Sequence, residues 1–137
     1  MDERFIIDTN IVIYYLDNKI PNDQMPKLSQ IFVDSFNLST ISIIELLGWH
    51  KLSDVDKKKM ELFLSNANVH FVDLSIQIKS IEIKQKRKIA TPDTIIAATA
   101  ILNGYTIVTR NVDDFSKIDK IKIFNPFENV DKRDNKM

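Results

Sequence analysis

Short apolar runs alternate with helical segments along this chain. The runs are rich in β-branched and aromatic residues, as buried strands are, and they predict strands at residues 5–7, 38–41, 69–72, 106–109 and 121–124. Helical spacing or cap signals predict helices at 10–16, 27–36, 75–87 and 92–103, with two more opening at Ser42 and at Asp54 or Asp56. Uniformly apolar strands that alternate with helices are typical of a parallel sheet covered on both faces. An α/β fold with a mostly parallel five-stranded sheet is therefore expected.

Cap signals fix the ends of two of these helices. The clearest helix covers residues 92–103, with Thr91 as its expected N-cap and Gly104 after its last turn. Its interior is apolar almost all round, which predicts a buried helix. Ser42 is the expected N-cap of an earlier helix, with Glu45 at the third helical position in a capping-box arrangement.

The composition fits a single soluble-type domain. The chain has 137 residues, of which 44% are hydrophobic and 28% charged. We expect one domain over residues 1–128 and a polar, flexible tail over residues 129–137. A signal-peptide pattern and an apolar run of membrane-spanning length are both absent from the sequence, so a cytoplasmic location and no membrane contact are the default expectations.

Several function classes are excluded by what the sequence lacks. There is no cysteine, so disulfides and thiolate chemistry are excluded, and neither a Gly-x-Ser-x-Gly motif nor a glycine-rich phosphate loop occurs. His50 and His70 are better explained as structural residues than as catalytic bases. A net charge of zero argues against bulk electrostatic binding of long nucleic acid, but it is compatible with acids pooled in one cleft and lysines at its rim. A basic run just before Asp93 could hold phosphates or could be a solvated helix end: Lys84, Lys86, Arg87 and Lys88.

Acidic residues follow or interrupt apolar runs at four places. Asp8 follows the first predicted strand, and the Asp113-Asp114 pair follows the fourth, where open α/β sheets bind ligands. Glu45 and Asp93 lie in the first turns of predicted helices. Each acid taken alone could be an ordinary helix cap or dipole partner, but acids embedded in apolar sequence need an explanation. Brought together, they would repel one another and favour a hard divalent cation.

Such a cluster could activate water for attack on a phosphodiester. Thr9 and Thr109 add hydroxyls near two strand ends, suited to a metal-bound water or a phosphate oxygen, although threonine is also common there for structural reasons.

In their order and spacing, these residues resemble the PIN-domain family, and more narrowly the VapC-type toxin ribonucleases. The matching segments are Ile7-Asp8-Thr9-Asn10, Ser39 to Leu46, Pro92 to Ala100, and Val108-Thr109-Arg110-Asn111 followed by Asp114-Phe115. The resemblance implies a Rossmann-like three-layer sandwich and an endoribonuclease that depends on Mg²⁺ or Mn²⁺. It also implies a homodimer that is neutralised by a cognate antitoxin protein.

The resemblance also assigns expected roles by position. Asp8 and Asp93 would be the main metal ligands, and Glu45 would complete the acidic site. Many PIN domains have an aspartate where this chain has Asn111, so Asp114 is expected to supply the fourth carboxylate. Asn111 then becomes a candidate for substrate contact, together with the two threonine hydroxyls.

Two alternatives remain open from the sequence. A PIN fold could be kept as a binding module with degenerate chemistry, which Asn111 favours. A phosphate-receiver domain could use Asp73 as phosphoacceptor, but the first strand offers only one acid, Asp8, and the last strand is followed by no lysine.

Overall fold

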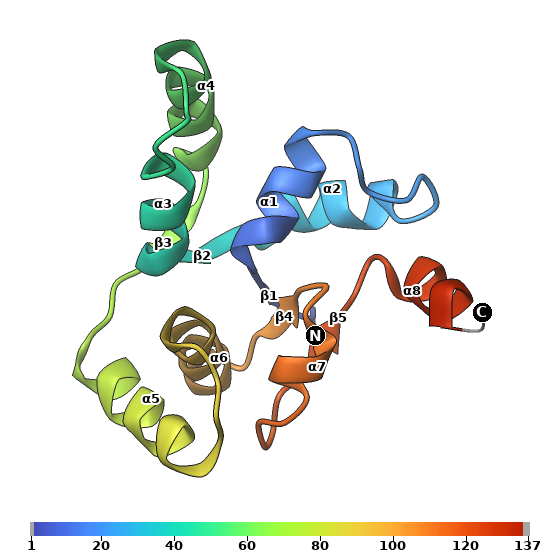
Figure 1. The fold of residues 1–137 in the computed structure, drawn as a ribbon. Coiled ribbons are helices and arrows are strands. Elements are labelled where there is room, and N and C mark those ends of the chain that lie inside the picture. Colours follow the sequence, from blue (N-terminus) through green and yellow to red (C-terminus); the bar gives the residue numbers. More distant parts are fainter. Residues whose placement is uncertain (1, 136–137) are drawn as a thin grey trace.

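Five parallel strands form the centre of the molecule (Figure 1). The computed structural model describes residues 2–135. The strand order is β3-β2-β1-β4-β5, and every pairing is parallel. The strands are β1 (Phe5–Ile7), β2 (Asn37–Ser39), β3 (Asn68–His70), β4 (Thr106–Val108) and β5 (Ile123–Phe124). The predicted α/β fold is confirmed, and the sheet is parallel throughout.

Alternation along the strands divides the core into two layers. Phe5 and Ile7 point into one apolar cluster, while Ile6 between them points into the other. Val108 and Ile107 divide in the same way. Because both faces of the three inner strands β2, β1 and β4 are buried, helices must cover both sides of the sheet, which gives the three-layer sandwich.

The helices are distributed over these two faces. The first cluster contains buried residues of α1 (Thr9–Leu16), α2 (Met25–Asp34), α3 (Thr40–Leu47) and α4 (Asp54–Leu64). The second contains buried residues of α5 (Leu74–Lys86), α6 (Thr91–Asn103) and the short α7 (Val112–Phe115). Among the described residues, 2–135, no helix is long and apolar enough to cross a membrane.

The direction in which strands are added to the sheet changes between β1 and β4. From β1 it moves outward through β2 to β3, then returns through α5 and α6 to place β4 on the other side of β1. The carboxyl ends of these two central strands therefore flank a topological switch point, where open α/β sheets bind ligands. Asp8 and Thr109 immediately follow the two strands.

Both predicted N-caps differ from the structure. The cap of α3 is Ser39, whose Oγ accepts a hydrogen bond from the backbone N–H of Ile41 at 3.1 Å, because β2 ends earlier than predicted. Ser42 is a buried residue inside the helix, so the capping box with Glu45 is wrong. Thr91 is the first residue of α6 rather than its cap, and Ala90 occupies the cap position. Gly104 ends α6 with φ 70°, as predicted.

The C-terminal segment contains an eighth helix, α8 (Glu128–Asn135), where the sequence predicts a polar tail. A tertiary contact to Arg110, described below, fixes this helix, and the sequence pattern of the segment does not reveal that contact. Residues 136 and 137 of the predicted tail lie outside the described residues.

Candidate active site

Asp8 is a carboxylate held at the centre of the sheet edge. It is only 7% exposed and it occupies the N-cap position of α1, but its side chain makes no capping hydrogen bond. Instead, the Thr109 hydroxyl donates to Asp8 Oδ2 at 2.7 Å and joins the ends of β1 and β4. The capping explanation of Asp8 therefore does not hold, and its carboxylate is directed to the switch point.

Glu45 reaches the same edge from α3. Thr9 Oγ1 donates to Glu45 Oε1 at 2.7 Å, and the same hydroxyl lies 2.8 Å from Ser42 Oγ. The sequence predicts Ser42 as a helix cap, yet Ser42 lies inside α3 and its hydroxyl forms a hydrogen bond with the Thr9 hydroxyl. A short polar chain thus orients a carboxylate that is itself exposed to solvent.

Asn111 connects the remaining two acids. Its side-chain amide donates to Asp93 Oδ2 at 3.4 Å and to Asp114 Oδ2 at 3.2 Å. Its backbone N–H donates to Thr109 Oγ1 at 2.9 Å, so the same residue also supports the hydroxyl that holds Asp8. An amide between two carboxylates supplies hydrogen-bond donors where a third acid would add repulsion.

Mutual repulsion shows that the four acids belong to one cluster. The pKa of Asp93 is raised to about 6, first by burial and then by the charges of Asp8, Asp114 and Glu45 in that order. The pKa of Asp8 is also raised, first by burial; hydrogen bonds from Thr109 and the Thr9 backbone oppose the shift, and the charge of Glu45 adds to it. The predicted set therefore comes together from four distant parts of the chain, whereas Asp113 is exposed.

The donor set has the chemistry of a hard-cation site. Carboxylate and amide oxygens are ligands of Mg²⁺ and Mn²⁺, and a cation would relieve the repulsion that raises the pKa of Asp93. Within residues 2–135, no group of three or more acidic or histidine side chains could hold a metal ion as arranged here. Binding would therefore require these side chains to close around the ion.

We expect metal-free protein to lose stability as pH rises. The folded pKa of Asp93 lies above its ordinary value, so the folded state holds this proton more tightly than the unfolded state does. The stabilisation that comes from binding this proton to Asp93 is complete below about pH 4 and is lost as pH rises through about 6. Thermal unfolding with a chelator present should show Asp93→Asn gaining stability over wild type from about pH 4.5 to 7. An unchanged difference between the two proteins across this range would contradict the prediction.

Arg110 lies between the site residues Thr109 and Asn111, but its guanidinium contacts α8 and not the acidic cluster. Its guanidinium donates to Asp131 Oδ1 of α8, from Nε at 3.2 Å and from Nη2 at 2.9 Å. It also lies 4.2 Å from the centroid of the Phe127 ring. This Arg110 clasp, formed with Asp131 and Phe127, ties α8 to the segment that carries Thr109 and Asn111.

The two histidines lie away from this cluster. His70 Nε2 lies 3.1 Å from the Tyr105 hydroxyl and 3.3 Å from Asn37 Oδ1, which agrees with the predicted structural role. His50 is exposed in the turn after α3. Asp73, the receiver-type alternative, accepts a hydrogen bond from the backbone N–H of Ile76 at 2.9 Å and caps α5.

Comparison with known families matches the PIN domain over residues 5–121. The chain belongs to the PIN domain family. The predicted family is confirmed, and the receiver alternative is wrong. Within this PIN domain, all seven predicted site residues lie in one connected set, from Asp8 and Thr109 through Asn111 to Asp93 and Asp114, with Glu45 and Thr9 beside them.

Relatives of this PIN domain cover nearly all of its length. It is 29% identical over 128 residues to Ribonuclease VapC1 of Rickettsia felis, an alignment that covers 86% of this chain and 92% of the relative. A toxin–antitoxin complex from Klebsiella pneumoniae contains a similar chain, with TM-score 0.72, 26% identity and coverage of 88% and 96%. VapBC-1 from nontypeable Haemophilus influenzae is similar as well, with TM-score 0.72, 25% identity and coverage of 89% and 97%.

Proposed function

We propose that this PIN domain is a metal-dependent endoribonuclease that acts as the toxin of a toxin–antitoxin pair. The observation that carries the proposal is the acidic cluster at the switch point, in which burial and then the charges of three other carboxylates raise the pKa of Asp93. The names of the relatives support the reaction class, since the matched Rickettsia felis protein is a ribonuclease.

We assign the metal to Asp8 and Asp93, with Glu45 and Asp114 completing the acidic site. A bound Mg²⁺ or Mn²⁺ would lower the pKa of water and neutralise charge on the phosphodiester. Thr109 keeps the Asp8 carboxylate in one orientation through its 2.7 Å hydrogen bond. Glu45 is exposed and accepts a hydrogen bond from Thr9, and it would accept the proton that water loses as it adds to phosphorus. One phosphorus–oxygen ester bond then breaks, and the departing oxygen takes up a proton from solvent.

The hydroxyl and amide groups around the acids are suited to the substrate. Thr9, Thr109 and Asn111 place hydrogen-bonding groups beside the carboxylates. An amide N–H₂ can donate to a phosphate oxygen, which a carboxylate cannot do. These contacts would position RNA with its scissile phosphate facing the acids.

The proposed partners need surface outside the acidic site. Large apolar side chains are exposed on α1, α3 and the turn after it, including Leu16, Ile44 and Trp49. A separate stripe of Leu74, Ile78 and Ile81 is exposed along α5. Exposed apolar faces of this kind are typical of protein interfaces, and two of them suit an antitoxin and a second copy of the chain. An intracellular RNA target would place the protein in the cytoplasm.

Cleavage of a mixed RNA pool tests the proposed reaction. Wild type with Mn²⁺ or Mg²⁺ should produce discrete fragments, whereas Asp8→Asn should produce none. Equal cleavage by both proteins would indicate a contaminating nuclease and would count against the proposal. Wild type that binds RNA but leaves it intact would favour the degenerate binding module, the alternative that Asn111 supports.

Asn111→Asp should strengthen metal binding and weaken the metal-free fold. The change replaces an amide that donates to Asp93 and Asp114 with another negative charge among them. We expect a lower melting temperature in chelator, a larger rise on adding Mn²⁺, and tighter Mn²⁺ binding by calorimetry. Asn129→Asp, which adds the same charge on α8, is the matched control. Metal binding equal to wild type would show that Asn111 does not face the cation.

A further inference from the structure

We propose that a cationic rim of Lys84, Arg87 and Lys117 binds the phosphates of RNA that flank the scissile bond. The inference rests on the proposed ribonuclease function, since it assigns a substrate contact beside the same acidic cluster. It resolves the basic run before Asp93, for which the sequence leaves open a phosphate-binding role and a solvated helix end.

Lys117 connects the rim to the acids. Its ammonium lies 3.6 Å from Asp114 Oδ1, with the lysine side chain 54% exposed and the aspartate side chain 41% exposed. An exposed ion pair of this kind is weak, so the ammonium can turn to a phosphate at little cost. One cation of the rim therefore lies within reach of both the cluster and solvent.

Arg87 lies against the same segment. Its Nε donates to the backbone carbonyl of Lys117 at 2.7 Å, and its Nη1 donates to the carbonyl of Lys86 at 2.9 Å. These two bonds fix the guanidinium while leaving Nη2 for another acceptor. The Arg87 side chain is thereby fixed against the segment that carries Lys117, at one edge of the site.

Lys84 extends the rim to the start of α6. Its ammonium donates to the Ile89 carbonyl at 2.9 Å and to Thr91 Oγ1 at 3.2 Å. Thr91 opens the helix whose first turn carries Asp93. Because Lys84 and Arg87 are already anchored by hydrogen bonds, binding a phosphate would cost them less side-chain entropy than it would cost freely moving side chains.

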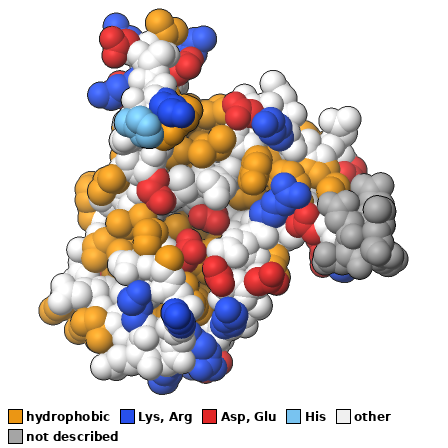
Figure 2. Space-filling view, viewed as in Figure 1, with side chains coloured by type: hydrophobic (Ala, Val, Ile, Leu, Met, Phe, Trp, Pro, Cys, Tyr) orange, Lys and Arg blue, Asp and Glu red, His pale blue; other side chains and the backbone are white. Residues whose placement is uncertain are grey.

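Charge balance gives the rim its expected ligand. The acidic cluster repels a polyanion, and the chain as a whole is neutral, so attraction for RNA must come from local cations. Figure 2 shows basic side chains gathered below the acidic ones on this face. Cations beside an acidic centre would hold the backbone on either side of the phosphate that faces the acids.

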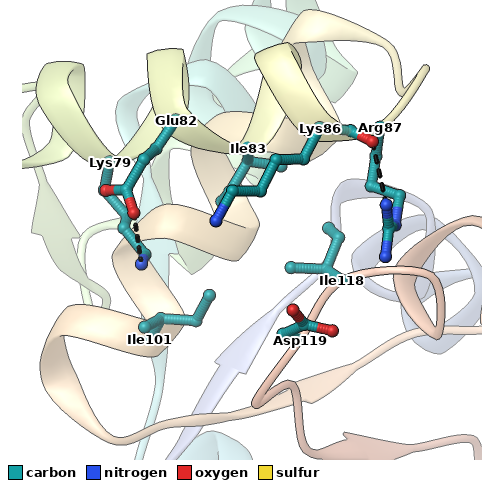
Figure 3. Close-up of a pocket in the computed structure, with 8 residues that line it drawn as sticks. All are labelled: Lys79, Glu82, Ile83, Lys86, Arg87, Ile101, Ile118 and Asp119. Atoms are coloured by element: carbon teal, nitrogen blue, oxygen red, sulfur yellow. Dashed lines mark hydrogen bonds and ion pairs between the residues drawn. The ribbon is translucent and has the colours of Figure 1, made fainter.

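Lys86 does not belong to this rim. It lines a small pocket between α5 and α6, together with Ile83, Arg87 and Ile101, and Figure 3 shows its ammonium directed into that pocket. Lys84 and Arg87 donate to the segments next to Asp93 and Asp114, whereas the Lys86 ammonium points into this pocket.

Salt-dependent RNA binding tests the rim. Binding of a labelled single-stranded RNA would be measured by fluorescence anisotropy with Asp8→Asn as the non-cleaving parent. Lys84→Gln, Arg87→Gln and Lys117→Gln, each added to this parent, should lower the slope of log affinity against log salt by about 0.7. That change corresponds to about fivefold weaker binding at 0.1 M salt. Arg87→Lys, which keeps the charge, should retain the slope of the parent.

Lys58→Gln is the matched control, because Lys58 is exposed on α4, which projects from the opposite end of the molecule (Figure 1). Slopes unchanged in all three rim variants, or lowered equally by Lys58→Gln, would overturn the rim. A parent that binds RNA without salt dependence would overturn it too. The readout is independent of cleavage, so an active wild type with unaltered slopes rejects the rim alone. Altered slopes with an inactive wild type reject only the ribonuclease proposal. Thermal unfolding of each variant verifies that the fold is intact.

Discussion

Asp93→Asn should lower RNA cleavage about 100-fold or more, equivalent to roughly 3 kcal/mol of lost transition-state stabilisation. Asparagine keeps the size of the side chain but removes a charge that a cation would require. The same change should raise the melting temperature of the metal-free protein, because Asp93 is repelled by Asp8, Asp114 and Glu45. Loss of activity together with a gain of stability separates a functional acid from a structural one.

Asp113→Asn provides the matched control for this prediction. Asp113 neighbours Asp114 on α7 but is exposed, and its removal should leave both cleavage and melting temperature near wild type. Rates would be measured on one defined RNA cut by the wild type, with Mn²⁺ in excess. An Asp93→Asn protein that cleaves within threefold of wild type would contradict the assignment of Asp93 to the metal.

Removal of divalent cations should abolish cleavage completely. Chelator would leave four carboxylates facing an RNA phosphodiester with no charge to balance them. Mn²⁺ or Mg²⁺ should restore activity and should also stabilise the fold, since a ligand that binds only the folded state at 100 times its dissociation constant adds about 2.7 kcal/mol. Thermal unfolding in chelator and in each metal measures this effect without reference to activity.

The control for the metal effect is the double variant Asp8→Asn, Asp93→Asn. It should start from a higher melting temperature than wild type in chelator and should show little further rise with Mn²⁺. Equal stabilisation of both proteins would place the bound metal elsewhere. Cleavage that persists in chelator would reject a metal-dependent reaction.

The sequence predicts which acids come together because β1 and β4, the strands at the centre of the sheet, are short and mostly apolar. In a parallel sheet all strands end at one edge, so a residue that follows a strand has a known position. Asp8 and Thr109 follow adjacent strands, which makes their 2.7 Å contact a direct consequence of strand order. Asn111 departs from the acidic pattern of the family, and the structure gives its amide two carboxylate partners.

Contacts between distant segments account for what the sequence does not predict. The sequence predicts Ser42 as a helix cap, yet β2 ends at Ser39, three residues before it. Ser42 therefore lies inside α3, where its hydroxyl contacts that of Thr9. The helix α8 has a polar sequence with little apolar periodicity, and its position depends on Asp131 meeting Arg110. Local propensity cannot reveal either partner, because each lies more than 20 residues away in sequence.

The Arg110 clasp makes the two ends of the chain unequal for protein engineering. A purification tag or fluorescent fusion at the C-terminus would load α8, whose Asp131 holds the residue between Thr109 and Asn111. Such a fusion would lower activity by disturbing the contact between Asp131 and Arg110, although the acidic site itself is unchanged. A fusion at the N-terminus would leave that helix unloaded. An inactive protein with a C-terminal tag should therefore be tested again with the tag at the N-terminus before the loss of activity is attributed to any residue.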